Sequence, residues 1–358
     1  MTNIYDDCWA KTNALEVRWD GKFRPCCVFN SRGTNFDTNI DTTTKHFKNF
    51  SDDAAKTGCQ KCFTQEQIGI GSRRRFLQRY KDKNYLYFYD LQLSNVCNLA
   101  CTMCSSYYSS KWENLNKKIG LDFVIKPDTV SAKKWSSNNS EHLLEHVNEK
   151  SKLGLVCISI KGGEPTMQPE ISTFLDALKY TKNVHLHIIT NLQRWPDWFN
   201  DLQKYKKVTI GVSIEGVNET YEYSRVYGSW KKFHDNVQRL IKVGADWGFK
   251  PLYTAHTIGD STRLLEYMEK YSPTGLKGLS LNNFAMKPTY VSPTVFPMVI
   301  KQAMARVMRL EVHILRDNMI KTKFNQLNYD RFVEYTQKLD KVNGTRFEDT
   351  TTGRYFHW

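Results

Sequence analysis

The sequence predicts an α/β fold built around a parallel sheet. Short apolar segments rich in branched residues recur along the middle of the chain and are typical of buried strands. We expect strands at residues 85–95, 154–161, 184–190, 207–214, 251–257 and 278–283. Segments such as 171–179 and 231–243 carry an apolar residue every three or four positions, which indicates helices between the strands. Alternation of strands and helices is typical of a parallel sheet.

Size and composition favour a soluble protein with a substantial core. The 358 residues can form one α/β domain of roughly 200 to 250 residues with smaller additions. Hydrophobic residues make up 40% of the chain and aromatic residues 13%, which is enough for a packed core. The opening segment 1–7 is polar and lacks the apolar region of a signal peptide. No apolar run approaches the length of a membrane-spanning helix, so we expect a cytoplasmic protein without a membrane partner.

The net charge of +14 is concentrated in part at residues 72–81, where four arginines and a lysine alternate with aromatic residues. One interpretation is a surface for a nucleotide, a nucleic acid or an acidic partner. The other, which we favour, is a solvated helix whose Phe76, Leu77 and Tyr80 face the core.

Cysteine spacing gives the strongest chemical signal in the chain. Nine cysteines in a protein without an export signal favour metal ligation over disulfides. Cys97, Cys101 and Cys104 follow the strand at 85–95, at the strand end where parallel α/β folds place their chemistry. Three thiolates on one loop suit an iron–sulfur cube and leave one iron open to another molecule. A structural zinc site is the alternative, but zinc normally takes four protein ligands, and no cysteine or histidine follows closely after Cys104.

A second motif, Gly162-Gly163-Glu164-Pro165, follows the strand at 154–161. Together with the cysteine triplet, it makes the chain resemble the radical S-adenosylmethionine (SAM) superfamily. The resemblance implies an open, partial barrel of six strand–helix units over residues 85–284. It also implies a [4Fe-4S] cluster on the three cysteines, with the methionine part of SAM bound to the open iron and the Gly-Gly-Glu-Pro element against its amino group. Such an enzyme cleaves SAM reductively to a 5′-deoxyadenosyl radical, which takes a hydrogen atom from the substrate.

Other residues are assigned to SAM by the same resemblance. Polar side chains at strand ends, Thr190, Asn191 and Ser213, would lie near the ribose. Arg225 would pair with the methionine carboxylate, which its forked guanidinium suits, although a surface ion pair is an equal alternative. Met103 stands where relatives often carry an aromatic residue near the adenine, and a methionine can fill that space. Asp90 and Glu215 are further candidates for binding a substrate.

Residues 1–84 form a cysteine-bearing module that we expect to contain a β-hairpin, with strands at 14–19 and 23–30 around Asp20-Gly21. Its cysteine spacing resembles the twitch module of the SPASM/twitch branch of radical SAM enzymes, although that module usually follows the barrel. The resemblance implies an auxiliary [4Fe-4S] cluster on Cys8, Cys26, Cys59 and Cys62, with Cys27 as a possible substitute for Cys26. A four-cysteine zinc ribbon is the alternative. The polar segment 105–150 is expected to be an insertion or lid, and residues 285–358 a helical extension.

These observations lead to three hypotheses for function. The favoured one is a radical SAM enzyme that modifies an amino-acid residue of a peptide or protein, with the auxiliary cluster as electron relay and a flavodoxin- or ferredoxin-type reductant. The alternative is the same radical chemistry on a nucleotide, nucleic acid or sugar. The second alternative is a non-catalytic binding protein stabilised by zinc.

Overall fold

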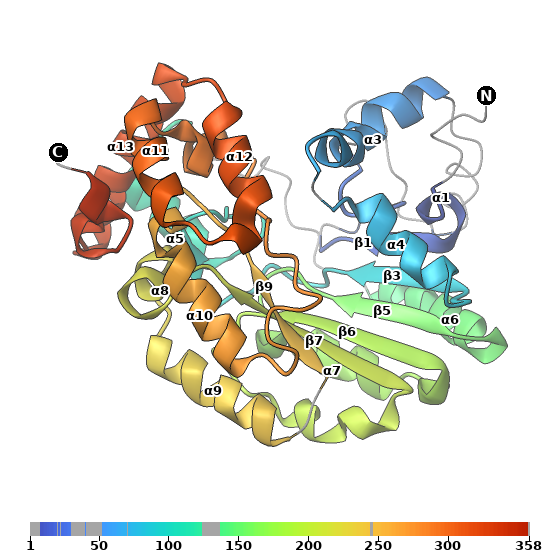
Figure 1. Cartoon of the computed structure of the whole chain (residues 1–358). Coiled ribbons are helices and arrows are strands. Elements are labelled where there is room, and N and C mark those ends of the chain that lie inside the picture. The colour runs from blue at the N-terminus through green and yellow to red at the C-terminus, as the bar shows by residue number, and fades with distance from the viewer. Residues whose placement is uncertain are drawn as a thin grey trace. The chain divides into compact units, whose positions relative to one another are not determined.

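The computed structural model describes residues 8–19, 21, 23–29, 40, 52–69, 71–123, 137–243 and 246–356. The chain forms two compact units (Figure 1). The first unit comprises Met1–Asn95, Thr129–Ile189 and Pro196–Thr209, and the second comprises Val96–Asp128, Thr190–Trp195 and Ile210–Trp358. The N-terminal module contributes a strand to the sheet of the first unit, and the expected division at residues 84 and 284 stays a prediction.

The sheet of the first unit is largely parallel. Its strands are β1 (Ala14–Val17), β2 (Phe23–Arg24), β3 (Tyr87–Leu91), β5 (Val156–Ile160) and β6 (Val184–Thr190), whose last residue belongs to the second unit. Strands β1 and β2 form the predicted hairpin, with Gly21 at φ 77°, whereas Asp20 lies outside the described residues. Strand β1 pairs in parallel with β3, β3 with β5, and β5 with β6. The second strand of the hairpin is only two residues long, shorter than expected.

Helices cover both faces of this sheet. The helices of the first unit are α1 (Ala10–Asn13), α3 (Asp52–Gln67), α4 (Arg73–Lys81), α6 (Ser137–Leu153) and α7 (Pro169–Asp176). On one face, Leu77 and Tyr80 of α4 pack against Phe88 and Cys157. On the other face, Tyr89 Oη lies 2.8 Å from Nδ1 of His146 in α6. The favoured interpretation of the basic stretch, a helix with an apolar face toward the core, is therefore confirmed for Leu77 and Tyr80.

The segment 105–150, expected to be an insertion or lid, holds α5 (Lys111–Ile119) in the second unit and α6 in the first. Helix α6 connects β3 to its parallel neighbour β5 and so acts as the crossover helix of a βαβ unit. Its sequence is polar because much of its surface is exposed, and this polarity hides the helix from a search for apolar periodicity.

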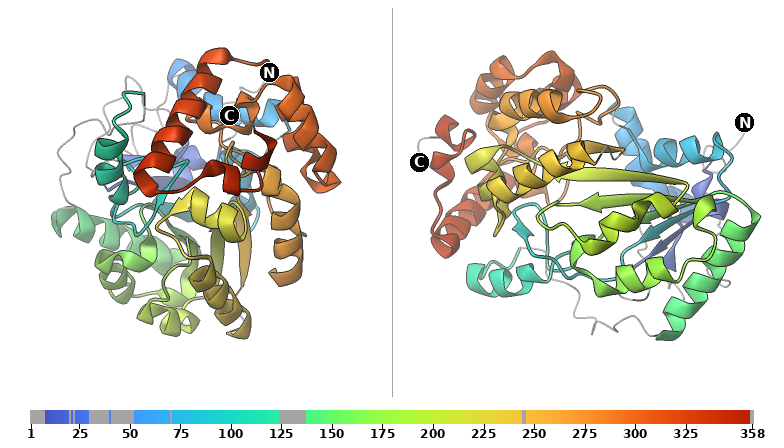
Figure 2. Two further views of the ribbon diagram at one scale, coloured as in Figure 1. Left: turned by 90° about the vertical axis from the view of Figure 1, so that its left-hand side faces the viewer. Right: turned by 90° about the horizontal axis from the view of Figure 1, so that it is seen from below.

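The second unit carries the C-terminal helices, drawn in orange and red in Figure 2, and two strand pairs, of which β7 begins with three residues of the first unit. Strand β7 (Lys207–Ile214) pairs in parallel with β9 (Trp247–Pro251), and β4 (Ala100–Cys101) pairs antiparallel with β8 (Arg225–Val226). Besides α5, its helices are α8 (Asn218–Ser224), α9 (Trp230–Lys242), α10 (Ser261–Tyr271), α11 (Met298–Val307), α12 (His313–Lys321) and α13 (Gln326–Asn343). The expected helical extension thus contains α11, α12 and α13. None of the helices in the described residues is long and apolar enough to span a membrane.

The mixed α/β fold with a parallel sheet is confirmed, and four of the six expected strands fall where they were predicted. The fifth lies earlier than predicted, at Trp247–Pro251, because residues 254–257 turn, with the backbone N–H of Thr254 donating to Thr257 Oγ1. The sixth is reduced to a parallel bridge between Tyr253 and Phe284. Gly278, at φ 76°, opens that segment in a left-handed conformation that a strand does not accept.

Candidate functional site

The loop with Cys97, Cys101 and Cys104 lies in the second unit, where a short antiparallel ladder and a tight turn shape it. Cys101 in β4 is the register partner of Arg225 in β8. The N–H of Cys104 donates to the carbonyl of Cys101 at 2.8 Å, so these two residues are the first and last residues of one tight turn.

Side chains from distant segments fix the backbone of this loop. The indole N–H of Trp112 in α5 donates to the carbonyl of Cys101 at 3.0 Å. The hydroxyl of Tyr335 in α13 donates to the carbonyl of Thr102 at 2.8 Å. Sequence reasoning missed both residues, because nothing in their local pattern distinguishes them from ordinary core aromatics.

Burial opposes the thiolate form in which Cys101 and Cys104 would bind a metal. Burial raises the pKa of Cys104 to about 12 and that of Cys101 well above its usual range, against the opposing charge of Arg225. Buried thiolates need a strong positive partner, which a bound metal supplies. Within the described part of the chain, no three His, Cys, Asp or Glu side chains are arranged to hold a metal ion. The fit of a cluster therefore rests on three soft donors in Cys-x3-Cys-x2-Cys spacing on one loop.

Beside the loop, Arg225 forms a buried ion pair with Glu215 at the end of β7. Its Nε lies 2.5 Å from Glu215 Oε2, and its Nη2 lies 2.8 Å from Oε1. Both side chains are only 4% exposed, so a surface ion pair is wrong as a description of Arg225. The edge of the guanidinium formed by Nε and Nη2 is occupied by Glu215, and a carboxylate of SAM would have to approach the remaining edge.

The other strand-end residues of this unit have separate roles. Asn191 Nδ2 lies 2.9 Å from Asn98 Oδ1 and 4.0 Å from Cys97 Sγ, which brings Asn191 to the cysteine loop. The hydroxyl of Thr190 accepts a hydrogen bond from the N–H of Leu192 and so shapes the turn after β6. Ser213 is half-buried in β7, and Met103 is half-buried within the loop.

The Gly-Gly-Glu-Pro element belongs to the first unit, at the end of β5. Gly162 and Gly163 have φ values of 79° and 45°, which favour glycine. A Cβ on Gly162 would lie 2.8 Å from both Cβ and Cγ of Gln92, so the close approach of the two segments also requires glycine. Glu164 is buried and caps the 3-10 helix Pro165–Met167 by accepting from the backbone N–H of Thr166 at 3.1 Å. The sequence therefore builds a rigid turn here.

A buried charge cluster precedes this turn. Lys161 Nζ and Arg73 Nη2 each lie 2.7 Å from Asp90 Oδ2, and Glu16 is the register partner of Asp90 on β1. Burial alone would raise the pKa of Asp90, but Lys161 and Arg73 hold it below its ordinary value. Arg73 is thus occupied inside the unit and does not contribute to a basic surface patch.

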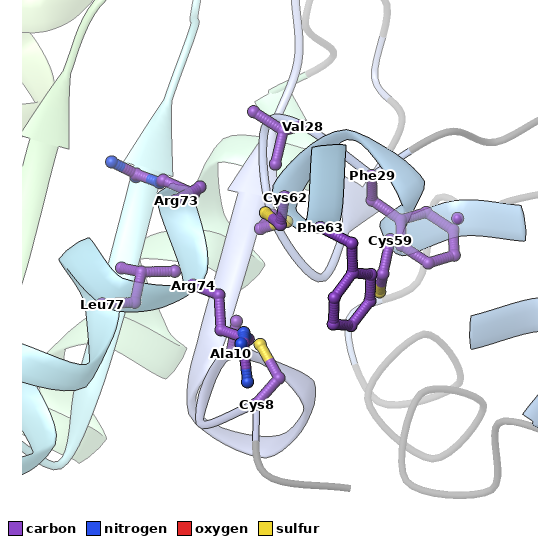
Figure 3. A pocket seen from close by; sticks show the side chains of 12 residues that line it. Cys8, Ala10, Val28, Phe29, Cys59, Cys62, Phe63, Arg73, Arg74 and Leu77 are labelled. Atoms are coloured by element: carbon purple, nitrogen blue, oxygen red, sulfur yellow. The ribbon is translucent and has the colours of Figure 1, made fainter. Parts of the chain in front are cut away.

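The four cysteines assigned to the N-terminal module line one pocket of the first unit (Figure 3). These residues are Cys8, Cys26, Cys59 and Cys62. A Cβ on Gly58, which precedes Cys59 on α3, would overlap the ring of Phe29, another lining residue. Cys27 instead lies near Asp90, Arg73 and Lys161, whose charges act on its thiol.

Comparison with known proteins gives one family match. The model of the Radical SAM superfamily matches residues 91–281. A search of curated proteins gave no match. Among solved structures, anSMEcpe with bound AdoMet is 17% identical and covers 71% of this chain and 60% of its own, with a TM-score of 0.37.

Streptococcus suis SuiB bound to S-adenosylmethionine is 13% identical and covers 92% of this chain and 69% of its own, with a TM-score of 0.39. SuiB bound to precursor peptide SuiA is 14% identical, with coverages of 94% and 70% and a TM-score of 0.36. The chain spans 46% of the length of a hexahistidine-tagged anSMEcpe structure that it also matches.

Proposed function

This chain belongs to the radical SAM superfamily, and we propose that it modifies an amino-acid residue of a peptide or protein by radical chemistry. Membership of the superfamily makes the chain an enzyme that uses a [4Fe-4S] cluster and SAM. The observation that carries the radical chemistry is the cysteine loop at 97–104, which the second unit anchors at the carbonyls of Cys101 and Thr102.

In this proposal, Cys97, Cys101 and Cys104 hold the catalytic cluster. When bound, the cluster and SAM supply the reductive cleavage that yields a 5′-deoxyadenosyl radical. The chain's own contribution is position and exclusion of water. Asn191 lies at the cysteine loop, where we assign it to the ribose of SAM. The assignment of the Gly162–Pro165 turn to the methionine amino group stays a prediction from the family resemblance.

The peptide substrate is supported by the resemblance of the N-terminal module to the twitch module of peptide-modifying relatives. The auxiliary [4Fe-4S] cluster is assigned to Cys8, Cys26, Cys59 and Cys62, because these four cysteines line one pocket. The position of Cys27 beside the charge cluster favours Cys26 as the ligand. Zinc in this pocket is the competing assignment for the module.

The other functional hypotheses receive less support. The hypothesis of a nucleotide or nucleic-acid substrate rested on the basic stretch at 72–81. In that stretch, Arg73 pairs with Asp90 and Arg74 pairs with Glu66. These ion pairs neutralise two of its charges within the first unit. The non-catalytic zinc protein is set aside by the family assignment. A flavodoxin- or ferredoxin-type reductant remains a proposal.

The proposed chemistry is tested by anaerobic reconstitution with iron and sulfide, followed by incubation with dithionite and SAM. We expect 5′-deoxyadenosine from the wild type and none from the Cys97, Cys101, Cys104 triple alanine variant, measured by mass spectrometry. Cys157→Ala, at a buried cysteine assigned to neither cluster, is the matched control and should retain activity. Deoxyadenosine formed equally with and without every peptide offered would contradict the peptide substrate.

A further inference from the structure

We propose that Arg74 fixes a positive charge in the cysteine pocket of the first unit and raises the reduction potential of an iron–sulfur cluster held there. The inference rests on the auxiliary cluster of the proposed function and assigns a role to a residue of the basic stretch. Arg74 stands near the start of α4 and lines the pocket together with the four cysteines.

The guanidinium of Arg74 lines the same pocket as the thiols. Figure 3 shows its nitrogen atoms beside the sulfur of Cys8. Its charge acts on the thiols of both Cys8 and Cys59, which come from different segments of the module. A cluster bound by these cysteines would therefore have the guanidinium as a close neighbour.

Glu66 holds the guanidinium in this position. Arg74 Nη2 lies 2.5 Å from Glu66 Oε2, and its Nε lies 3.2 Å from Oε1, which is the forked geometry of a strong arginine–carboxylate pair. The guanidinium also lies over the ring of Phe63, 5.3 Å from its centroid. Ser72 donates a further hydrogen bond to Glu66 and fixes the carboxylate. These contacts preorganise the charge, so little side-chain entropy is lost when a ligand binds.

The other residues that line the pocket strengthen the electrostatic effect of the Arg74 charge. It is mostly apolar, with Ala10, Val28, Phe29, Phe63 and Leu77 around the cysteines, and its described residues include no acidic side chain. Electrostatic interactions are stronger in such a low-dielectric environment than in water. Arg73 also lines the pocket, but its guanidinium is turned to Asp90 and lies over the rings of Phe76 and Phe88. Arg74 is therefore the lining cation whose charge acts on Cys8 and Cys59, and Lys11, outside the lining, acts on the same two thiols.

The expected effect follows from charge alone. A cluster held by four thiolates is an anion, and it gains a further negative charge on reduction. A fixed cation beside it stabilises the reduced form more than the oxidised form and so raises the potential. Glu66 lies behind the guanidinium and offsets this effect in part.

The test uses the Cys97, Cys101, Cys104 triple alanine variant of the full chain, which leaves the auxiliary cluster as the only reconstituted one. Reduction potentials are measured by a redox titration followed by electron paramagnetic resonance. We expect Arg74→Gln to shift the potential to a lower value and Arg74→Lys to shift it less. Glu66→Gln keeps the hydrogen-bonding shape and removes the counter-charge, so it should shift the potential upward. Arg79→Gln, at an exposed arginine of the same helix, is the control and should not move it.

The outcomes separate the inference from the function on which it rests. Iron retained in all variants, with potentials equal to that of the parent, would overturn the role of Arg74 and leave the auxiliary cluster intact. Zinc in place of iron in the parent would overturn both. If Arg74→Gln does not fold, the upward shift of Glu66→Gln still decides the question, because its absence contradicts the proposal.

Discussion

The hydroxyl of Tyr335 donates a 2.8 Å hydrogen bond to the backbone carbonyl of Thr102, within the loop that carries the three cysteines. The tyrosine is 1% exposed and its ring stacks with that of Trp112, which holds the neighbouring carbonyl of Cys101. The backbone of the loop is thus fixed by two helices that both follow it in the sequence, α5 closely and α13 at a separation of 233 residues between Thr102 and Tyr335. The helical extension at the C-terminus therefore contributes directly to the candidate site.

Tyr335→Phe should loosen this loop while keeping the ring packing. The change leaves the carbonyl of Thr102 without this donor, which costs about 1 kcal/mol. We expect a reconstituted Tyr335→Phe variant to lose iron to a chelator faster than the wild type, as followed by absorbance. Tyr329→Phe, at a half-buried tyrosine of the same helix, is the control. Equal rates of iron loss in both variants would refute the anchoring role of Tyr335.

Gly162→Ala should disturb the turn that carries the Gly-Gly-Glu-Pro element. The alanine would need φ 79° and would place its Cβ 2.8 Å from Gln92. The free-energy costs of backbone strain and of overpacking therefore add up in this variant. Gly120→Ala isolates the first effect, because Gly120 has φ 66° and open space around its missing Cβ. We expect a loss of about 1 kcal/mol for Gly120→Ala and about 3 kcal/mol for Gly162→Ala, measured by urea unfolding. SAM affinity should fall only in Gly162→Ala, and equal effects of the two variants would exclude a special role for Gly162.

Features that depend on neighbouring residues could be predicted from the sequence. The cysteine triplet, the Gly-Gly-Glu-Pro turn and the strands around Phe88 and Ile158 each have a local pattern, and all lie where parallel α/β architecture places them. Pairings between distant residues could not be predicted, because no local signal links them. Arg73 with Asp90 and Tyr335 with Thr102 are such pairs. A binding surface was one interpretation of the basic stretch because its acidic partners lie outside the stretch itself.

Removing one partner of the buried ion pair between Glu215 and Arg225 should destabilise the protein more than removing one partner of an exposed pair. Glu215→Gln removes the counter-charge and leaves the guanidinium of Arg225 buried beside Cys101. We expect a loss of about 3 kcal/mol in the free energy of unfolding, measured with urea on the apoprotein. Asp235→Asn is the control, since the side chains of its pair with Lys231 are 85% and 56% exposed, and it should cost less than about 1 kcal/mol. Similar losses in the two variants would show that Arg225 finds another partner.

Asp260 should make stability depend on pH between about 4 and 6. Burial raises the pKa of this carboxyl to about 6, against the opposing N–H of Val217 and the charge of Arg263. A raised folded-state pKa means that the native protein favours the protonated acid, so its contribution to stability is fully present below the unfolded pKa, near 4. That contribution is lost as the pH rises to about 6, and it then stays constant.

Asp260→Asn removes this titration, so the wild type should lose about 2 kcal/mol relative to the variant between pH 4 and 6.5. Urea unfolding at pH 4, 5, 6.5 and 7.5 measures the difference. Asp201→Asn, at an exposed aspartate, is the control and should follow the wild type at every pH. A constant difference between the wild type and Asp260→Asn across this range would mean that the carboxyl is ionised in the native state throughout, with Arg263 outweighing burial.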